Sequence, residues 1–415
     1  MIFSYYAYLK KFSNNAKLFL CGNFLFSFGI SFFGLLFNLY LKKKGLSESQ
    51  VGGVLSYVAL GATFMALFSG LFLESIKTKW AMTASVLIIP LCEIGQVYFN
   101  DLSVVKIFSF ISGMFSALLA VSVGPFFMRN SSELERVHLF SFHFACSIFA
   151  QFLGFYIAGN TPNILIQKLG ELPYDGYFHS VLIGSILALS SLFIFSKIEK
   201  KAIPKVLAPL KYRLQKTEWK KVFKLMLPKF ALGMGAGMII PFLNLYLKQV
   251  FHLSTAKIGL FFSIQQIFIF LGMLAMPLIA ESLGKLGCII VTTSLSIPFM
   301  LTMALTQSWQ ICIVAFCFRG MLMNMSSPVT SIFEMSYVNE QDQSVITAFS
   351  FFAWNLGWSF SSKMSGEIIE NYSFRYSFYI AIILYFISIL GYLLLFWPTT
   401  KRCYKKEKSF FYFFI

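Results

Sequence analysis

A single arginine lies near the middle of a long stretch of uncharged residues. Arg319, in the segment "CFRGMLM", is the only charged residue between Trp309 and Phe333. If this stretch crosses a bilayer, a charge at its centre costs roughly 2.5–3.5 kcal/mol by insertion scales, and exposure to lipid is nearly excluded. Two interpretations remain. Arg319 binds an anionic or strongly polar group of a small molecule or a titrating carboxylate, or it forms a structural ion pair between two helices.

Polar residues at helical spacing are candidates for the lining of a cavity near Arg319. Asn23, Ser27, Ser31 and Asn38 recur on one face of an otherwise apolar stretch. A face of this kind indicates either a wet cavity or close packing of small residues between helices, and here we favour the cavity. Gly233 and Gly237, in a similar pattern, favour packing and bending. The candidate substrate-binding residues are Arg319, Asn23, Ser27, Ser31, Asn38, Gln151, Asn244, Gln266, Asn324, Trp354, Asn355 and Trp358.

Proton coupling requires a group that changes its protonation state inside the protein. Glu93 is the only carboxylate that falls well inside a predicted span, and His143 lies about one turn inside another. Histidine titrates near neutral pH when its environment is unperturbed. Both residues are therefore candidates for proton coupling. The alternatives are a carboxylate partnered at a helix interface and a histidine that serves packing.

The composition identifies the elements that position these residues. Of 415 residues, 57% are hydrophobic and 12% are charged, and phenylalanine occurs 51 times. Soluble domains carry about 25% charged residues, so this chain is a membrane protein. Its net charge of +17 is concentrated at the two ends and between residues 197 and 224. That distribution predicts cytoplasmic segments that meet anionic lipid headgroups, and it argues against binding of nucleic acid.

Hydropathy predicts twelve membrane-spanning helices and no cleavable signal peptide. An even number of spans and basic ends place both termini in the cytoplasm. The expected organisation is a bundle over 1–196, a basic cytoplasmic linker over 197–222, a second bundle over 223–400, and a basic and aromatic cytoplasmic tail over 401–415. The predicted spans are 17–41, 49–73, 80–98, 105–128, 138–159, 179–196, 223–247, 257–280, 287–306, 309–333, 344–366 and 374–397.

The second half of the chain repeats the first. Asn38-Leu39-Tyr40-Leu41-Lys42 reappears as Asn244-Leu245-Tyr246-Leu247-Lys248, and Glu74-Ser75 reappears as Glu281-Ser282. Ser112-Gly113-Met114 aligns in the same way with Arg319-Gly320-Met321. Because nearly the same offset holds at separated places, we infer that two parallel six-helix repeats make up the chain.

Twelve spans in two parallel repeats joined by a basic linker resemble the major facilitator superfamily over the whole chain. The family's loop signature, Gly-x-x-x-Asp-Arg-x-Gly-Arg-Arg, corresponds to "GLFLESIKTK" at 70–79 and to "PLIAESLGKLG" at 277–287, where serine replaces the arginine. The resemblance implies alternating access around a site between the halves. It also implies that Glu74 and Glu281 form a conformational latch at the cytoplasmic ends of their helices, and it assigns no subfamily.

We therefore expect a secondary transporter for a small amphipathic or anionic solute, of the drug- or metabolite-efflux type and coupled to protons. The alternatives are a solute importer and a receptor or scaffold that keeps the carrier fold without transport. An enzyme is not expected, since no Walker A motif, HExxH motif or paired metal ligands occur. We expect no cofactor, no metal site and no nucleic-acid partner, and a monomer.

Overall fold

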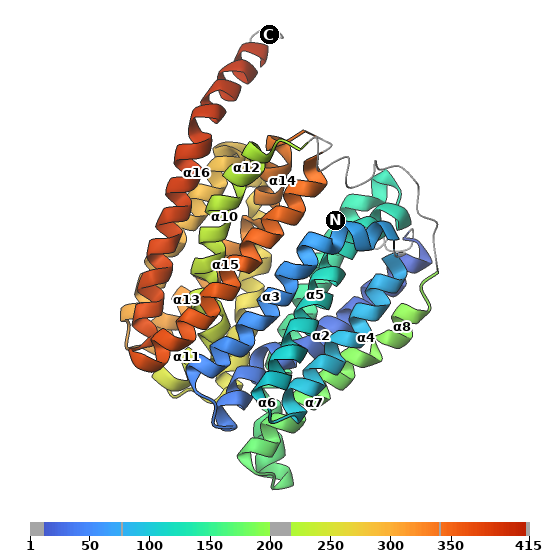
Figure 1. Cartoon of the computed structure of the whole chain (residues 1–415), viewed down its shortest axis with the longest axis vertical. Helices are drawn as coiled ribbons and strands as arrows, with labels where there is room; N and C mark the ends of the chain where they lie inside the picture. Colours follow the sequence, from blue (N-terminus) through green and yellow to red (C-terminus); the bar gives the residue numbers. More distant parts are fainter. Residues whose placement is uncertain (1–11, 76–77, 200–216, 340–341, 412–415) are drawn as a thin grey trace.

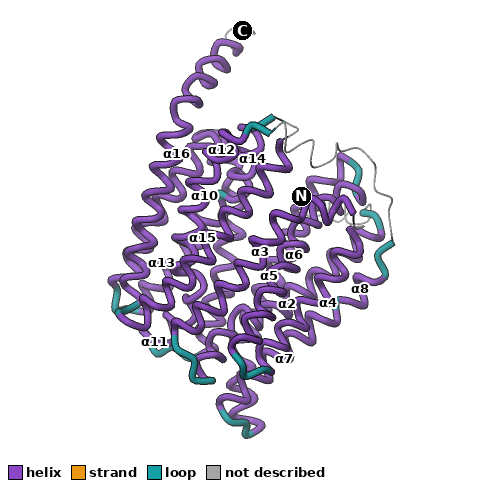
Figure 2. The backbone as a smooth tube through the Cα atoms, viewed as in Figure 1, coloured by secondary structure: helices purple, strands orange, loops and turns teal. Residues whose placement is uncertain are grey.

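Every element of secondary structure in the described part of the chain is a helix. The computed structural model describes residues 12–75, 78–199, 217–339 and 342–411, and Figure 2 shows helices joined by short loops. Helices suit this apolar chain because each satisfies its own backbone hydrogen bonds within the bilayer. The predicted all-α polytopic fold is confirmed.

The N-terminal half contains seven labelled helices, on the right of Figure 1. They are α2 (Asn14–Lys43), α3 (Glu48–Ser75), α4 (Thr78–Tyr98), α5 (Leu102–Asn130), α6 (Glu133–Leu169), α7 (Pro173–Ser190) and α8 (Leu192–Ser196). Side-chain oxygens of Ser13 and Asp101 accept hydrogen bonds from the first turns of α2 and α5. Such caps satisfy backbone N–H groups that a helix start leaves unpaired.

The C-terminal half lies on the left of Figure 1. Its helices are α10 (Trp219–Ile239), η1 (Ile240–Phe242), α11 (Leu243–Val250), α12 (Thr255–Leu305), α13 (Trp309–Met325), α14 (Ser327–Tyr337), α15 (Gln343–Asn371) and α16 (Phe374–Phe411). The short 3-10 turn η1, which contains Pro241, separates α10 from α11. The seventh predicted span is therefore bent, because proline removes a backbone donor and clashes with the preceding turn.

The twelve predicted spans correspond to these helices, although 179–196, 223–247 and 309–333 each cross a break between consecutive elements. Ten described segments are long and apolar enough to cross a membrane, and one of them, Thr255–Leu305, is 51 residues long. Gly284 interrupts that segment with a φ of 68°, so α12 contains two spans. The remaining span, the eleventh along the chain, is α15, which is not among those ten segments but packs lengthwise against α3 and α10.

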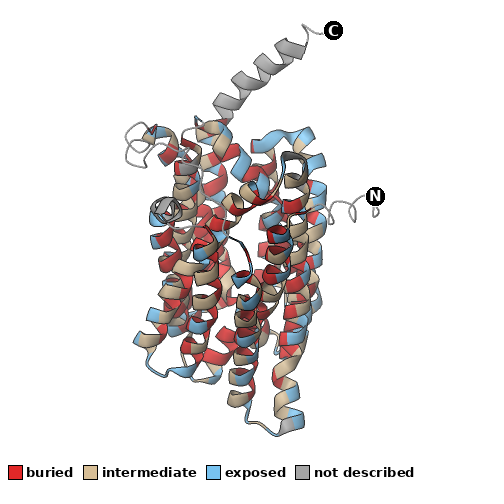
Figure 3. Ribbon diagram, turned by 90° about the vertical axis from the view of Figure 1, so that its right-hand side faces the viewer, coloured by how far each residue is buried: buried red, intermediate tan, exposed pale blue. Residues whose placement is uncertain are grey.

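Two ends of the bundle are distinguished by the chain connections. At the linker end α2 begins, α8 ends and α10 begins, and at the far end α2 ends and α3 begins. The linker end is at the top of Figure 1, where α16 projects beyond its neighbours. Figure 3 shows buried residues concentrated within the bundle, with exposed residues on its outside and at its ends.

Glycines allow the helices within each half to pack closely. A Cβ added to Gly113 on α5 would lie 1.9 Å from the carbonyl oxygen of Val58 on α3. On α10, a Cβ at Gly233 would lie 2.4 Å from the carbonyl oxygen of Trp354 on α15. Small residues drive helix association in lipid because they let backbones approach closely. These contacts hold each half together along the membrane normal.

The two halves meet through α3 against α15 and α6 against α12. Ser359 Oγ donates to the carbonyl of Ser56 at 2.9 Å, and Ser263 Oγ donates to the carbonyl of Phe152 at 2.8 Å. A Cβ at Gly159 would lie 2.8 Å from the Cα atom of Gly259. These contacts involve the parts of α3 and α12 that lie toward the far end, so the halves are closed there.

The internal repeat appears as a repeated hydrogen bond. Tyr40 donates its hydroxyl to the carbonyl of Val97 at 2.7 Å, and Tyr246 donates its hydroxyl to the carbonyl of Met303. Donor and acceptor are displaced by the same offset in the two halves. Both tyrosines are buried. The sequence repeat around "NLYLK" therefore corresponds to a repeated structural contact.

Candidate functional site

A cavity of about 860 Å³ lies between the halves, on the linker-end side of their contact. The N-terminal half contributes residues of α3 and α5, and the C-terminal half contributes residues of α10, α12, α13, α14 and α15. Its size is within the range of pockets that take small organic molecules. The lining residues are Ala66, Leu67, Val121, Pro125, Lys229, Leu232, Ile289, Thr293, Met323, Asn324, Ser326, Ser327, Thr330, Ser331, Glu334, Val345, Thr347, Ala348, Phe349, Ser350, Phe351 and Trp354.

One wall of this cavity is polar and the facing walls are largely apolar. The polar wall follows α13 and α14, where Asn324, Ser327, Thr330 and Ser331 precede Glu334. The helix breaks at Ser326 between these two elements, and Pro328 follows at the start of α14. Aromatic side chains of α15 and aliphatic side chains of α3 and α5 complete the lining. The cavity thus offers hydrogen-bonding groups on one side and apolar contacts on the others.

An ion pair is part of the polar wall. Lys229 Nζ on α10 lies 2.9 Å from Glu334 Oε1 on α14, and the side chains are only 17% and 6% exposed. Glu334 was not among the predicted site residues because the predicted tenth span ended at Phe333. Helix α14 continues to Tyr337, which places the carboxylate inside the bundle. A span boundary drawn one residue later would have included it.

Arg319 lies deeper, below the cavity residues Met323 and Asn324 on the same helix. It is 3% exposed, and its Nη2 donates to the hydroxyl of Tyr385 on α16 at 2.6 Å. Its buried Nε has no hydrogen-bond partner, and no acidic side chain pairs with it among the residues that the structure describes. The structural ion pair that the sequence left open is therefore absent here. The guanidinium is a buried cation with unused donors.

Asn324 and Trp354 are the two predicted substrate-binding residues that line the cavity. Asn324 is exposed to it, and its Nδ2 donates to the carbonyl of Gly320 at 2.8 Å. The ring of Trp354 lies 5.9 Å from that of Trp358, one turn further along α15. Asn355 donates to the carbonyl of Phe351 within the same helix at 2.8 Å. Trp358 and Asn355 therefore support the cavity wall without lining it.

The polar face of the first span packs against α6 instead of lining this cavity. Asn23 Nδ2 donates to Ser147 Oγ on α6 at 2.8 Å. Ser31 lies against Gly154 of α6, and its hydroxyl bonds back to the carbonyl of Ser27 at 2.7 Å. Small and polar residues at four-residue spacing suit such a helix contact equally well. The periodicity was a sign of close packing, so our preference for a cavity does not describe this conformation.

Asn38 and Asn244 lie at the far end, where the halves meet. Asn38 Nδ2 donates to the carbonyl of Pro241 and to Oδ1 of Asn244, and the second distance is 3.3 Å. Asn244 Nδ2 donates in return to the carbonyl of Leu35 at 2.8 Å. Both side chains are buried. They close the bundle on this side and do not contact the cavity.

The two predicted glutamine ligands do not line the cavity either. Gln266 on α12 is buried, and Gln151 on α6 is half-buried. The neighbouring Gln265 lies closer to the central cation, since its side chain covers Gly320 next to Arg319 and its Nε2 donates to the carbonyl of Phe316 at 3.5 Å. Sequence reasoning could not choose between two adjacent glutamines on a helix whose rotation was unknown.

The proton-coupling candidates lie away from the cavity. Glu93 on α4 is 2% exposed and accepts a hydrogen bond from Ser185 Oγ on α7 at 3.1 Å. His143 packs its ring against Phe19 and Phe127, and its Nδ1 has no partner. Glu93 thus occupies the helix-interface position that was the alternative to coupling. His143 lies in an aromatic cluster of the N-terminal half.

The predicted latch is only partly described. The side chain of Glu74 lies outside the described residues. Glu281 is exposed, and it forms no ion pair with any cation in the described ranges. The nearby Lys285 donates from Nζ to Ser336 Oγ on α14 at 3.0 Å. In this second copy, a lysine and not the glutamate makes the described contact between helices.

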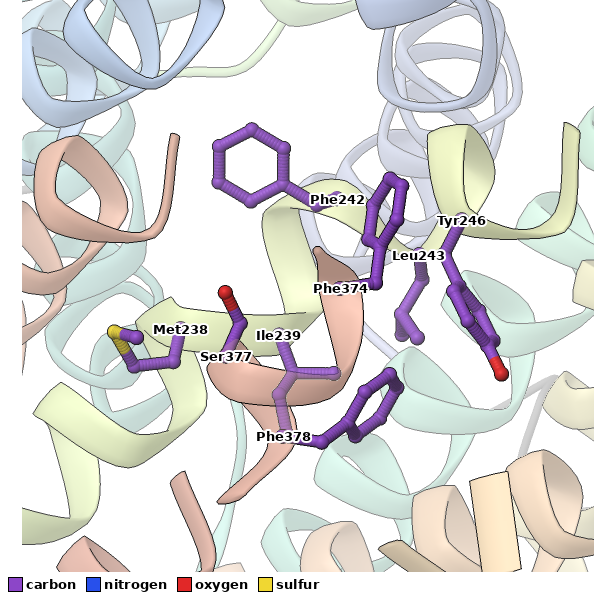
Figure 4. A pocket seen from close by; sticks show the side chains of 8 residues that line it. All are labelled: Met238, Ile239, Phe242, Leu243, Tyr246, Phe374, Ser377 and Phe378. Atoms are coloured by element: carbon purple, nitrogen blue, oxygen red, sulfur yellow. The ribbon is translucent and has the colours of Figure 1, made fainter. Parts of the chain in front are cut away.

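A second cavity is too small for a solute. It lies beside η1, where Met238, Ile239 and Phe242 face Phe374 and Phe378 of α16 (Figure 4). Its volume is about 10 Å³, which is about the space of one water molecule. Apart from the hydroxyls of Ser377 and Tyr246, its lining is apolar. It marks the imperfect packing of the bent seventh span.

The family of the chain follows from a comparison with family models. The model described as Major Facilitator Superfamily matches residues 19–362 and again 225–410. The chain belongs to the Major Facilitator Superfamily. The second match covers the C-terminal half alone, in agreement with the internal repeat. No curated protein sequence matches the chain.

Solved structures of other Major Facilitator Superfamily-like folds superpose on nearly the whole chain. The nucleoside transporter NupG aligns with a TM-score of 0.74 at 12% identity, over 92% of this chain and 99% of its own. A D-xylose-proton symporter aligns with a TM-score of 0.72 at 16% identity, over 92% of this chain and 96% of its own. A bacterial homologue of the human lysosomal transporter Spinster, inward-facing and unoccupied, aligns with a TM-score of 0.73 at 10% identity, over 92% of this chain and 96% of its own.

These similarities establish the fold and the general class. The protein is an integral multi-pass membrane protein and a secondary transporter of the Major Facilitator Superfamily, which is a family of transporters and not of enzymes. Identities of this size show the fold alone, so the substrate must be argued from the cavity. Within the described residues, no three His, Cys, Asp or Glu side chains are grouped as metal ligands.

Proposed function

We propose that the protein carries a small amphipathic anion across the membrane by alternating access. The moving bodies are the segments 1–196 and 223–400, joined by the linker 197–222. The observation that carries the proposal is the cavity, which has one polar wall with a lysine and facing apolar and aromatic walls. An apolar body can bind the aromatic side, and a charged group can bind the polar side.

The preference for an anion rests on two cations that differ in depth. Lys229 is part of the cavity wall, and Arg319 lies below it with unused hydrogen-bond donors. Arginine stays charged in proteins, so Arg319 makes the inner end of the cavity permanently positive. That field attracts an anionic group into the cavity without direct contact between the anion and the guanidinium. We assign Arg319 a long-range attraction for the anion, whose contact partner in the cavity is Lys229.

The linker end is proposed to face the cytoplasm. Basic residues are concentrated in the linker and at both ends of the chain, as the positive-inside rule requires of cytoplasmic segments. The cavity then opens inward, and the contacts between α3 and α15 and between α6 and α12 close the opposite side. Export and import both pass through this state, so it supports efflux and uptake equally.

A receptor that kept the carrier fold without transport is the alternative. The cavity between the halves contains an ion pair, and a buried cation lies below it. A receptor without transport needs no charged groups in the centre of the membrane, so these features favour a transporter. The helix glycines at the contact of the halves also suit surfaces that separate and rejoin. The alternative predicts binding of a ligand without movement of the halves.

The test compares a permanent amphipathic anion with its neutral analogue. 2-Naphthalenesulfonate and 2-naphthalenesulfonamide are added to the protein in lipid nanodiscs, and thermal unfolding is recorded. We expect the sulfonate to raise the midpoint and the sulfonamide to do so less, since binding to the native state stabilises it. In Arg319→Gln the difference between the two compounds should shrink. Equal effects of both compounds on the wild type would contradict the preference for an anion.

A further inference from the structure

We propose that Lys229 and Glu334 form a coupling site at which one proton and one anionic group are carried together. The proposal rests on the proposed function, because it assigns a role to two residues in the wall of the same cavity. None of the sequence-based coupling candidates lies there, whereas this pair combines a carboxylate and a cation in contact with the space for the solute.

The geometry separates this pair from a gate between the halves. Lys229 is on α10 and Glu334 is on α14, so both belong to the C-terminal half. Closing or opening the bundle at either end does not require the pair to break. Both residues nonetheless line the cavity, where a solute and water reach them. The pair is placed to respond to what the cavity holds.

Among the described residues, Lys229 alone forms an ion pair with Glu334, and the nearby Lys285 of α12 donates instead to Ser336 Oγ on α14 at 3.0 Å. Tyr392 of α16 is buried within electrostatic range of the carboxylate, and its hydroxyl has no hydrogen-bond partner. On α15, the hydroxyl of the cavity residue Ser350 is also unpaired. The cavity-lining residues of α12 are Ile289 and Thr293, which carry no charge. Lys229 is therefore the partner whose charge decides the state of Glu334.

Arg319 is too far away to take part in this exchange. It precedes Glu334 by four helical turns, which corresponds to about 22 Å along straight helices. Its charge is permanent, so it is the same whether the site is empty or occupied. It adds a constant field and does not change the balance between the states of the pair.

The net charge of the pair yields a rule for coupling. The empty pair is neutral, since the ammonium and the carboxylate cancel. Binding of a monovalent anion alone gives a charge of −1, and binding of a proton alone gives +1. Binding of both restores neutrality. Enclosing a net charge in the closed cavity is costly because water is then excluded at both ends. Only the two neutral states, the empty carrier and the carrier with both the proton and the anion bound, are therefore expected to reorient.

The exchange is a simple proton transfer. A hydronium ion in the cavity gives its proton to a carboxylate oxygen of Glu334, leaving water and a neutral carboxylic acid. The N–H donors of Lys229 that had bound the carboxylate become free to bind the anionic group. When the cavity opens on the other side, the anion leaves, the acid returns its proton to water, and the ion pair forms again. No bond of the solute changes.

This rule fixes the direction of coupling. The proton and the anion bind together and cross together, so transport is an electroneutral symport. A proton gradient directed into the cytoplasm would then drive uptake of the anion. The proposal therefore favours the importer alternative over proton-driven efflux.

The experiment measures binding of 2-naphthalenesulfonate in nanodiscs between pH 5.5 and 8.5. The probe stays ionised throughout, so any dependence on pH comes from the protein. Where Glu334 is mostly ionised, we expect the affinity of the wild type to fall about tenfold per pH unit, because each anion bound requires one proton. In Glu334→Gln the affinity should be high and independent of pH. In Lys229→Gln it should fall at least about tenfold at pH 5.5.

A matched control is Glu218→Gln. Glu218 forms an ion pair with Lys221 at 3.0 Å near the start of the same helix, but both side chains are exposed and neither lines the cavity. This variant should keep the pH dependence of the wild type. Proton uptake in weakly buffered solution gives a measurement that needs no variant: about one proton should be taken up per sulfonate bound at pH 8.

The outcomes distinguish the two proposals. If the sulfonate fails to bind to the wild type and to Glu334→Gln at every pH, the proposed function itself is contradicted. If it binds but Glu334→Gln keeps the pH dependence of the wild type, or if no proton is taken up on binding, the coupling site is contradicted while the anion carrier stands. Unchanged binding by Lys229→Gln would also overturn the coupling site.

Discussion

Asn38 and Asn244 hold equivalent positions in the two halves of the chain, and they hydrogen-bond to each other across the far end. Each also donates to a backbone carbonyl of the opposite half, at Pro241 and Leu35 respectively. A self-complementary contact of this kind is expected where two equivalent surfaces meet around a two-fold axis. Because these three bonds cross between the halves, all of them must break when the far end opens.

Removing either amide should shift the protein toward the state that is open at the far end. Asn38→Ala and Asn244→Ala each leave buried polar partners unpaired, at a cost of about 1–3 kcal/mol to the closed state. That corresponds to a roughly 5- to 150-fold change in the ratio of the two states. Spin labels at Ser103 and Gln307, exposed at the far end of the two halves, would report the change as a longer distance.

Asn355→Ala is the matched control for this pair. Its amide donates only to the carbonyl of Phe351 within α15, so no bond between the halves is lost. The distance between the labels should stay as in the wild type, in a background from which the native cysteines have been removed. Equal distance distributions for all three variants would contradict the role of the asparagine pair.

The contact between Gly159 and Gly259 predicts a second way to open the far end. A methyl group at Gly159 would lie 2.8 Å from the Cα atom of Gly259 and 2.9 Å from the carbonyl oxygen of Thr255. Gly159→Ala should destabilise the closed contact by about 1–3 kcal/mol, because backbone atoms cannot move aside locally. The same spin-label distance measures this shift.

Gly124→Ala provides the comparison for that substitution. No atom lies within 4 Å of a Cβ added there, and the residue is inside helix α5. Alanine should therefore be tolerated or should stabilise the helix by about 0.5–1 kcal/mol. A far end that opens equally in Gly124→Ala would show that helix propensity, and not the contact between the halves, controls the equilibrium.

The repeated tyrosine bonds predict similar losses of stability in the two halves. Tyr40→Phe and Tyr246→Phe each leave a buried carbonyl without its donor, at a cost of about 1–3 kcal/mol. Tyr40→Phe should be the more severe, since Tyr40 also bonds to the hydroxyl of Tyr174 at 2.7 Å. Thermal unfolding in detergent measures both. The exposed Tyr376→Phe should change stability by less than about 0.5 kcal/mol, and a loss as large as that of Tyr246→Phe would contradict the interpretation.

Much of the fold was predictable from the sequence because hydropathy and the repeat depend on local composition. Each predicted span corresponds to one helix or to two consecutive ones, and the repeated "NLYLK" segments make the same contacts. Helix ends were harder to place. Membrane-spanning helices continue beyond their apolar cores, and α14 extends past the predicted boundary far enough to bring Glu334 into the bundle.

The site was less predictable than the fold because helical spacing does not say which neighbour a face meets. The stripe from Asn23 to Ser31 has the pattern of a cavity wall but packs against α6. Arg319 was identified because it is the only charge in a long apolar stretch. Its hydrogen-bond partner, Tyr385, is 66 residues away in sequence and could not be predicted in this way. The pairing of Lys229 with Glu334 depends on how α10 and α14 are placed in the bundle, which no local pattern encodes.

The central claim is that the cavity carries an anion together with a proton. The most direct test uses proteoliposomes that contain an internal pH dye, with 2-naphthalenesulfonate added outside and no membrane potential imposed. We expect acidification of the interior with the wild type, and the same flux with Glu93→Gln, whose carboxylate lies outside the cavity. Glu334→Gln should exchange the sulfonate across the membrane without moving protons. Acidification by Glu334→Gln, or its loss in Glu93→Gln alone, would contradict the account and move coupling to α4.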